Sequence, residues 1–484
     1  MLNRRTGWMK VVVLCLSIGL ITSTMPFSAS SEAADSGTTK KRVQERKYKE
    51  GEILVKFKTG ESVESLNRTQ VNHHLIEKMD FPQNQTKLLS FNLQSTIDQV
   101  VSDLLGSGLV EYAEPNYERT FTVTDPLYGE QWGMENRGQS ISGINGTPDI
   151  DIDAERAWVQ TRGSNSVVVG VIDSGIDMSH PDLRNRIWKN PGEISGDGID
   201  NDRNGYIDDV NGWNFYDENN AIFYSSNEDA HGTHVAGIIA ANNNNIGVTG
   251  VAPNVKIMPL KIMAEGGYVS DVLEAIAYAK AKGVKIINMS LGGWTFSQAE
   301  YDVIKNTNAL FVVAAGNNSS NIDGYFSSYP AAYDLPNIIS VAAIDNQGNV
   351  PYWSNYGTTS TDLAAPGVNI LSTLPGNTYG YYNGTSMAAP YVTGTAALLL
   401  SKNRSASVLQ IKETLLKTTT SVSSLSWKVS TGGMLNAGKA LNATMSGNPV
   451  RSPAMSPAQE AQEVQEVHED NIMYRFFQRF FNWG

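Results

Sequence analysis

Residues 384–390 read Gly-Thr-Ser-Met-Ala-Ala-Pro, and an apolar run rich in alanine and leucine follows them to Ser401. The pattern predicts a tight glycine turn that leads into a long buried helix, with Ser386 at or near the helix N-terminus. A serine hydroxyl placed there is a candidate nucleophile, but it needs a neighbouring base to take its proton at neutral pH. The other interpretation is a simple helix cap, because serine is a preferred capping residue.

Two upstream segments supply the partners that such a nucleophile needs. Residues 167–172 form an apolar, β-branched run, which predicts a buried strand that ends at Asp173. His231 opens the segment His-Gly-Thr-His-Val-Ala-Gly; Asp229 before it suits a helix entry, and the apolar residues after it predict a helix. The chain order Asp, His, Ser differs from that of chymotrypsin and of the α/β-hydrolases and matches that of the subtilisins.

With these motifs, the sequence resembles the subtilisin family of serine endopeptidases over roughly residues 125–440. The resemblance implies that Asp173 orients the imidazole, that His231 acts as general base and then as general acid, and that Ser386 attacks the peptide carbonyl. It leaves His234 as a supporting neighbour. It also implies an α/β fold, in which a mostly parallel central sheet lies in a three-layer, subtilisin-like arrangement.

Another strand-like run, residues 310–315, ends in Gly316 and Asn317. An amide side chain at the end of a buried strand can donate a hydrogen bond to the negative oxygen that develops when a peptide carbonyl is attacked. The resemblance implies this oxyanion-hole role for Asn317, with the backbone N–H of Ser386 as the second donor.

The segment after the predicted strand at 284–287 contains Ser290, Leu291 and Gly292. In the family that the sequence resembles, this segment pairs with the extended substrate backbone and forms one wall of the primary specificity pocket. Backbone pairing tolerates many substrate sequences. Composition alone also allows an ordinary glycine turn here. The resemblance therefore implies protein or peptide substrates without specifying their side chains.

These motifs predict a secreted serine endopeptidase that hydrolyses peptide bonds through an acyl-enzyme intermediate. Two alternatives stay open. One is a catalytically idle, calcium-dependent binding protein of protease ancestry, which the intact Asp173, His231, Asn317 and Ser386 disfavour. The other is a serine esterase, which the order of the triad and the missing Gly-x-Ser-x-Gly motif disfavour.

The first 34 residues have the features of a secretion signal. Three basic residues precede a short apolar run at 11–21, and small residues follow it, so residues 1–34 are predicted to be a signal peptide of a secreted protein. A membrane anchor is the alternative, but it needs about 20 apolar residues. The only cysteine, Cys15, lies in this segment. A mature protein without disulfides needs another means of stabilisation.

A separate module is expected between the signal and the catalytic region. Residues 35–122 show a strand pattern, a helix pattern opened by Ser95 and Thr96, and a final strand pattern, which together predict a small α+β domain. The resemblance implies a ferredoxin-like pro-domain that inhibits the enzyme until cleavage between Tyr117 and Thr124. A permanent accessory domain is the alternative. The catalytic domain is expected over 123–445.

Residues 200–209 read Asp-Asn-Asp-Arg-Asn-Gly-Tyr-Ile-Asp-Asp. Oxygen side chains at alternate positions and a glycine at the sixth are typical of a calcium loop of the EF-hand kind, and Ile207 is expected to hold the loop against the core. A solvated acidic loop is the alternative, but carboxylates this close repel one another unless a cation lies between them. The predicted calcium ligands are Asp200, Asp202, Asn204, Tyr206 and Asp209, with Asp208 as the alternative to Asp209 for completing the shell.

The resemblance implies another calcium site around the asparagine-rich stretch 241–248. Without the resemblance, this stretch is an ordinary loop. The family's ligands, carried over, are the Asn244 side chain, the carbonyls of Asn242, Ile246 and Val248, and the carboxylates of Asp125 and Asp182.

The chain of 484 residues carries a formal net charge of −12, and the acidic excess lies beyond the predicted pro-domain. This charge disfavours nucleic acid as a partner and suits cation binding. Residues 446–484 form a linker, an acidic stretch and an aromatic repeat at helical spacing beside Arg475 and Arg479. The repeat allows packing on the chain itself or contact with a partner, a membrane or the cell envelope.

Overall fold

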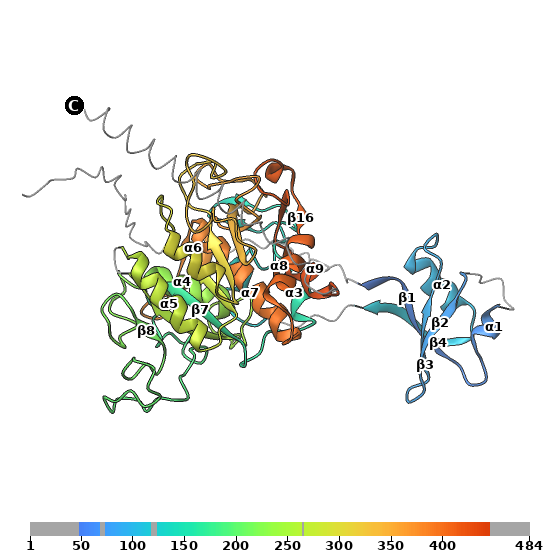
Figure 1. The fold of residues 1–484 in the computed structure, drawn as a ribbon. Helices are drawn as coiled ribbons and strands as arrows, with labels where there is room; N and C mark the ends of the chain where they lie inside the picture. The colour runs from blue at the N-terminus through green and yellow to red at the C-terminus, as the bar shows by residue number, and fades with distance from the viewer. Residues whose placement is uncertain (1–47, 68–72, 118–122, 264–265, 446–484) are drawn as a thin grey trace, which may run out of the picture. The chain divides into compact units, whose positions relative to one another are not determined.

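A computed structural model describes residues 48–67, 73–117, 123–263 and 266–445. The predicted signal peptide at 1–34, the tail at 446–484 and most of the predicted cleavage segment lie outside these ranges. The chain forms two compact units, Met1–Glu118 and Arg119–Gly484 (Figure 1).

The N-terminal unit is a four-stranded antiparallel sheet with two helices. Its sheet order β2-β3-β1-β4 and its β-α-β-β-α-β chain order are those of a ferredoxin-like fold, as predicted. Thr96 caps the second helix with a complete capping box, which confirms the predicted helix start. The elements are β1 (Tyr48–Phe57), α1 (Val63–Asn67), β2 (Ile76–Phe81), β3 (Thr86–Ser90), α2 (Ile97–Gly106) and β4 (Val110–Tyr117).

The second unit is built on a nine-stranded sheet in the order β16-β17-β13-β12-β11-β10-β7-β9-β8. The strands from β17 to β8 pair in parallel, and β16 is antiparallel to β17 at the edge. The strands are β7 (Val168–Asp173), β8 (Trp213–Asn214), β9 (Lys256–Lys261), β10 (Ile286–Met289), β11 (Leu310–Ala314), β12 (Ile338–Ile344), β13 (Leu363–Pro366), β16 (Thr420–Ser421) and β17 (Gly433–Met434). The predicted mostly parallel central sheet is therefore present.

Helices cover both faces of this sheet. Alternate residues of β11 point to opposite faces, so Val312 packs in one hydrophobic core and Phe311 in the other. The first core includes residues of α3 (Ala154–Trp158), α4 (Ala230–Ala240), α7 (Thr385–Lys402), α8 (Val408–Lys417) and α9 (Ala437–Asn442). The second core includes residues of α5 (Val269–Ala281) and α6 (Gln298–Lys305). The result is the predicted three-layer arrangement.

Short elements complete the unit. They are the hairpin strands β5 (Ser140–Ile141) and β6 (Ile144–Asn145), the hairpin strands β14 (Ile370–Leu374) and β15 (Thr378–Tyr382), and the 3₁₀ turns η1 (Tyr128–Glu130) and η2 (Ser423–Leu425).

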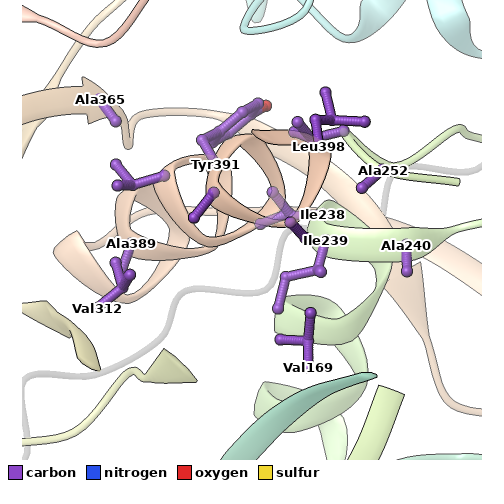
Figure 2. Packing of buried hydrophobic residues seen from close by; sticks show 14 of the residues in the cluster. Val169, Ile238, Ile239, Ala240, Ala252, Val312, Ala365, Ala389, Tyr391 and Leu398 are labelled. Atoms are coloured by element: carbon purple, nitrogen blue, oxygen red, sulfur yellow. The ribbon is translucent and has the colours of Figure 1, made fainter. Parts of the chain in front are cut away.

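The central helix α7 is buried on all sides. Almost every residue from Thr385 to Leu400 lies in the interior, where the helix packs against α4 and against the strands β10 to β13. Figure 2 shows Tyr391 and Leu398 on this helix, with Ile238 and Ile239 of α4 nearby. A helix that is apolar all round needs such a surrounding. Its N-terminus, which carries Ser386, is therefore held in a fixed place relative to the sheet.

Candidate active site

The candidate site lies where several parallel strands end, the usual place for a site in an open α/β sheet. Asp173 is the last residue of β7 and is 2% exposed. Its Oδ1 atom lies 2.7 Å from Nδ1 of His231, and the backbone N–H of Ser174 donates to the same oxygen at 2.8 Å. The predicted pair of Asp173 and His231 is thus in direct contact.

His231 lies in the first turn of α4, and its side chain is 38% exposed. Burial of the ring lowers the pKa of His231, but the charge and hydrogen bond of Asp173 outweigh this effect, so the pKa is raised above its ordinary value. The pKa of His234 shifts in the opposite direction, because burial lowers it to about 3. Its Nε2 lies 3.0 Å from the carbonyl oxygen of Gly380. His234 is therefore a neutral, structural neighbour.

Ser386 is the second residue of α7, and Pro390 four residues later shapes its surroundings. Proline has no N–H, so the carbonyl of Ser386 does not receive the usual hydrogen bond from the residue four positions on. The hydroxyl of Ser290 donates to that carbonyl instead, at 2.9 Å. The Ser386 hydroxyl donates to the Ser290 carbonyl at 3.3 Å. The predicted nucleophile and a predicted substrate-binding residue therefore form a reciprocal pair.

Asn317 follows β11 and lies against the start of α7. Its Oδ1 accepts hydrogen bonds from the backbone N–H and the hydroxyl of Thr385, both at 2.9 Å. Because both bonds go to the oxygen, the Nδ2 donor is left available. Gly384, with φ 154°, precedes the helix, and a Cβ at that residue would lie 3.5 Å from Asn317 Nδ2 and 3.6 Å from the backbone nitrogen of Ser386. The two predicted oxyanion donors therefore border the same small space.

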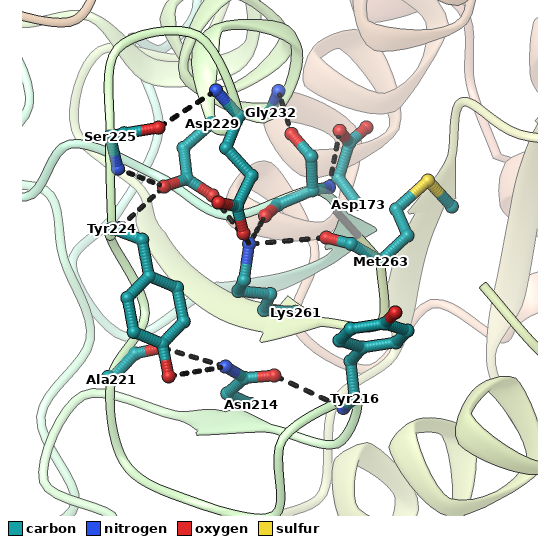
Figure 3. A network of polar contacts seen from close by, with 12 residues as sticks. Asp173, Asn214, Tyr216, Ala221, Tyr224, Ser225, Asp229, Gly232, Lys261 and Met263 are labelled. Carbon is teal, nitrogen blue, oxygen red and sulfur yellow. Dashed lines mark hydrogen bonds and ion pairs between the residues drawn. The ribbon is translucent and has the colours of Figure 1, made fainter. Parts of the chain in front are cut away.

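A buried lysine supports the loop that follows Asp173. Lys261 at the end of β9 is fully buried, and its Nζ lies 2.7 Å from Asp229 Oδ1 and 3.0 Å from Glu228 Oε1. It also donates to the carbonyl of Ser174 (Figure 3). Asp229 occupies the predicted N-cap position of α4, but its side chain makes no capping bond because Lys261 and the 224–225 backbone hold it. Sequence reasoning missed this lysine, since a buried strand end gives no charge signal.

His231 and Ser290 line a cleft of about 690 Å³. Leu291 and Gly292 line it, as predicted for a substrate-binding segment. The next residue, Gly293, exchanges backbone hydrogen bonds with Tyr329, at 2.8 and 2.7 Å. The Tyr329-Pro330 peptide bond beside the cleft is cis.

The structure brings together residues expected at the calcium site around 241–248. Asp125 Oδ1 accepts the backbone N–H groups of Asn244 and Asn245, at 2.9 and 2.8 Å. Asp182 Oδ1 accepts Nδ2 of Asn244 at 3.0 Å, and Asp182 Oδ2 accepts the N–H of Val248 at 3.2 Å. Burial raises the pKa of Asp182, although hydrogen bonds from Tyr379 and the loop oppose it. Two buried carboxylates converge on one loop, a donor set that fits a hard cation.

The acidic loop at 200–209 also forms a cluster of carboxylates. One oxygen each of Glu193, Asp200 and Asp202 lie within 4.8 Å of one another. Glu193 was not expected, because it precedes the loop motif; its Oε2 is buried and has no partner in the described part of the chain. Gly205, at the predicted turn, has φ 98°. Lys282 Nζ already pairs with Asp202 at 2.6 Å, so Glu193 and Asp200 supply the remaining negative charge, which suits an oxygen-loving cation.

Two expectations about this loop change. Ile207 is 51% exposed, so the prediction that it holds the loop against the core was wrong. The ring of Tyr206 packs on Trp213 and Tyr278 instead, with ring centroids 5.2 and 5.1 Å apart. Asp209 is fully buried and accepts the Tyr278 hydroxyl at 2.5 Å. Asp209 is not one of the three clustered carboxylates, but Asn190 Nδ2 joins it to them by donating to Asp209 Oδ1 at 2.7 Å and to Asp202 Oδ2 at 3.0 Å.

Comparisons with known proteins identify the family of this chain. A family model described as the subtilase family matches residues 164–445. The chain belongs to the subtilase family. A second model, the fervidolysin N-terminal prodomain, matches residues 34–116. The subtilase therefore carries a prodomain and a peptidase domain, and it is a serine endopeptidase, as the resemblance implied.

Several relatives align over most of this subtilase. The thermophilic serine proteinase of Bacillus sp. (strain AK1) is 35% identical, covering 81% of this chain and 90% of the relative. Subtilisin E of Bacillus subtilis (strain 168) is 34% identical, and the alignment covers 82% of this chain and 90% of subtilisin E. Fervidolysin of Fervidobacterium pennivorans is 31% identical over 81% of this chain, which spans only 58% of that relative's length.

The solved structure of fervidolysin from Fervidobacterium pennivorans, a keratinolytic enzyme related to subtilisin, is similar with a TM-score of 0.53 at 28% identity. The alignment covers 84% of the subtilase described here and 63% of the fervidolysin chain. These likenesses confirm the predicted subtilisin-like fold. Among the described residues, no helix has both the length and the apolar character needed to span a bilayer.

Proposed function

We propose that Asp173, His231 and Ser386 are the catalytic triad of this subtilase. The observation that carries the proposal is the 2.7 Å contact of Asp173 with Nδ1 of His231, which leaves Nε2 as the nitrogen that can face the nucleophile. The raised pKa of His231 suits a group that takes a proton and then returns it. The Ser386 hydroxyl donates to the Ser290 carbonyl at 3.3 Å, so the proposed mechanism requires that it turn to His231 instead.

The reaction proceeds through an acyl-enzyme intermediate. His231 removes the hydroxyl proton as Ser386 attacks the peptide carbonyl, and the imidazolium then protonates the departing amine. A water molecule, activated by the same imidazole, hydrolyses the ester. Asn317 Nδ2 and the backbone N–H of Ser386 stabilise the oxyanion, a role that the fixed Thr385 to Asn317 hydrogen bonds support.

Protein or peptide substrates bind in extended form along Ser290, Leu291 and Gly292. The cleft next to these residues supports this proposal, since strand-like pairing uses backbone groups that every peptide has. The domain boundaries that we propose are a signal peptide at 1–34, a pro-domain at 35–122, a catalytic domain at 123–445 and a tail at 446–484.

The pro-domain acts as an intramolecular inhibitor until it is cleaved off, and the protein is secreted. The match to a prodomain model supports the inhibitory role. The signal-like N-terminal sequence supports secretion.

Calcium stabilises the fold at two places. Asp125, Asp182 and Asn244, with the carbonyls of Asn242, Ile246 and Val248, would hold one ion, which the convergence of the two buried carboxylates supports. Glu193, Asp200 and Asp202, with Asn204, would hold the other. Tyr206 and Asp209 remain candidate ligands, although the buried Asp209 is better placed to support the loop than to bind the ion directly.

Cleavage of an unfolded protein such as casein tests the triad. The parent enzyme is compared with Ser386→Ala, and circular dichroism and thermal unfolding check that the variant folds like the parent. We expect the variant to lose cleavage by at least about 10³-fold while its fold is unchanged, because the alanine has no nucleophile. Equal cleavage rates for the two proteins would overturn the triad assignment.

A further inference from the structure

The substrate cleft contains an acidic side chain that the proposed mechanism does not use. Glu300 lies in the first turn of α6 and is only 5% exposed. It lines the same cleft as His231 and Ser290, and no lysine or arginine is found among the described residues that line this cleft. The other acidic residue of the cleft, Glu228, is paired with Lys261 at 3.0 Å. Burying a carboxylate is costly unless a partner offsets the lost hydration.

The local structure leaves the Glu300 carboxylate out of the cap of its own helix. Residues 297–300 read Ser-Gln-Ala-Glu, which is the pattern of a capping box. Ser297 Oγ accepts the N–H of Glu300 at 3.3 Å, which is one half of the box. In the other half, the N–H of Ser297 donates to the hydroxyl of Tyr333 at 3.1 Å and not to the carboxylate of Glu300. The helices α2 and α8, by contrast, have complete capping boxes.

One oxygen of the Glu300 carboxylate is left for a ligand. The Tyr333 hydroxyl donates to Oε2 at 2.8 Å, whereas Oε1 has no hydrogen-bond partner among the residues that the structure describes. Burial raises the pKa of Glu300, and the bond from Tyr333 opposes this effect. A positive group placed at Oε1 would supply both a donor and the missing charge.

The surroundings of Glu300 suit a long side chain with a charged end. Met263, Val272 and Leu291 line the cleft and offer apolar contact for an aliphatic stem. Tyr268 and Tyr329 also line it, and aromatic rings attract cations.

We propose that Glu300 makes this recess a subsite for a lysine or arginine side chain of the substrate, upstream of the bond that is cleaved. This inference rests on the proposed protease function and deepens it by naming a substrate class. The aliphatic stem packs on the apolar wall, and the cationic end binds Oε1 of Glu300.

Matched peptides test this subsite. Each peptide carries a lysine or its uncharged analogue norleucine at one position upstream of the cleavage site, and kcat/KM is measured for each pair. At one position we expect lysine to be preferred by about tenfold, because the ammonium pairs with a buried carboxylate. Glu300→Gln should reduce that ratio to about one, since the amide keeps the shape but not the charge.

Two further variants make the result decisive. Glu300→Leu should reverse the preference towards norleucine, a gain that misfolding cannot produce. Glu413→Gln, which neutralises an exposed carboxylate on α8, should leave the ratio unchanged. A ratio near one at every position in the parent enzyme, or a lysine preference that survives Glu300→Gln, would overturn the proposal. Failure of the proposed function looks different, because then no peptide of either kind is cleaved in a manner that depends on Ser386.

Discussion

At the scale of single residues, Pro390 sets the environment of Ser386, the proposed nucleophile. Its missing N–H frees the carbonyl of Ser386, and Ser290, just after β10, donates its hydroxyl to that carbonyl. Asn288 donates to the Ser290 hydroxyl at 2.9 Å, and Thr393 of α7 donates to Asn288 at 2.7 Å. The carbonyl that Pro390 leaves free is thus tied to the sheet by a chain of side-chain hydrogen bonds.

Asp173→Asn is expected to change both the rate and its pH dependence. The carboxylate raises the pKa of His231, so its removal lowers that pKa and lets the imidazole stay neutral at lower pH. The acidic limb of the kcat/KM profile should therefore shift to lower pH. The plateau should fall by about 10⁴-fold, because the ring loses the partner that fixes its tautomer.

A pH–rate profile of peptide hydrolysis measures both effects. Asp177→Asn is a suitable control, since this buried aspartate binds Ser179 and the N–H of Gly376 and not the imidazole of His231. An unshifted acidic limb in Asp173→Asn would contradict the electrostatic role of Asp173.

At the scale of elements, Asp323 ties its own loop to the 358–360 segment. Its carboxylate accepts the N–H and hydroxyl groups of Thr358 and Thr359 and the N–H of Ser360, at 2.5 to 3.0 Å, and we call this set of bonds the Asp323 clamp. Burial raises the pKa of Asp323, but these hydrogen bonds outweigh it and hold the pKa at about 2. The stability from this lowered pKa is present above the ordinary pKa of an aspartate and is lost as pH falls towards 2.

Asp323→Asn should lower the free energy of unfolding by about 1 kcal/mol at pH 7, because solvent screens this partly exposed carboxylate, and the difference should shrink between about pH 4 and pH 2. Urea unfolding in the Ser386→Ala background measures this without self-digestion. Asp302→Asn, on the exposed side of α6, serves as the control and should have little effect at either pH. A loss that is the same at both pH values would contradict the ionic role of Asp323.

The elements themselves were largely predictable from sequence, because buried parallel strands are continuous apolar runs. The runs before Asp173 and Asn317 end close to where β7 and β11 end. Contacts between distant residues were not predictable. The open capping box of α6 depends on Tyr333, which lies 36 residues after Ser297. Glu193 likewise joins the acidic loop only through folding.

At the scale of the whole molecule, bound calcium would take the place of disulfides. The only cysteine lies in the predicted signal peptide, and the described part of the peptidase domain contains two groups of oxygen donors. A ligand that binds only the folded state stabilises it by about 2.7 kcal/mol when the free ligand concentration is a hundred times the dissociation constant.

Chelation of calcium should therefore lower the midpoint of thermal unfolding by roughly 5–10 °C, measured by calorimetry in the Ser386→Ala background. Asp182→Asn should reduce the part of this calcium-dependent shift that comes from the site around 241–248. Asp200→Asn should reduce the part that comes from the site at 200–209. A midpoint that does not change with calcium concentration would count against both sites.

The Asp323 clamp bears on the rate at which the enzyme digests itself. Tyr325 and Phe326, just after Asp323, are 89% and 60% exposed. A protease cuts a neighbouring copy only where a segment can open and extend, so cleavage follows the population of locally opened chains. By tying this loop to the 358–360 segment, the carboxylate lowers that population. We therefore expect the clamp to slow autolysis and to lengthen the lifetime of concentrated enzyme.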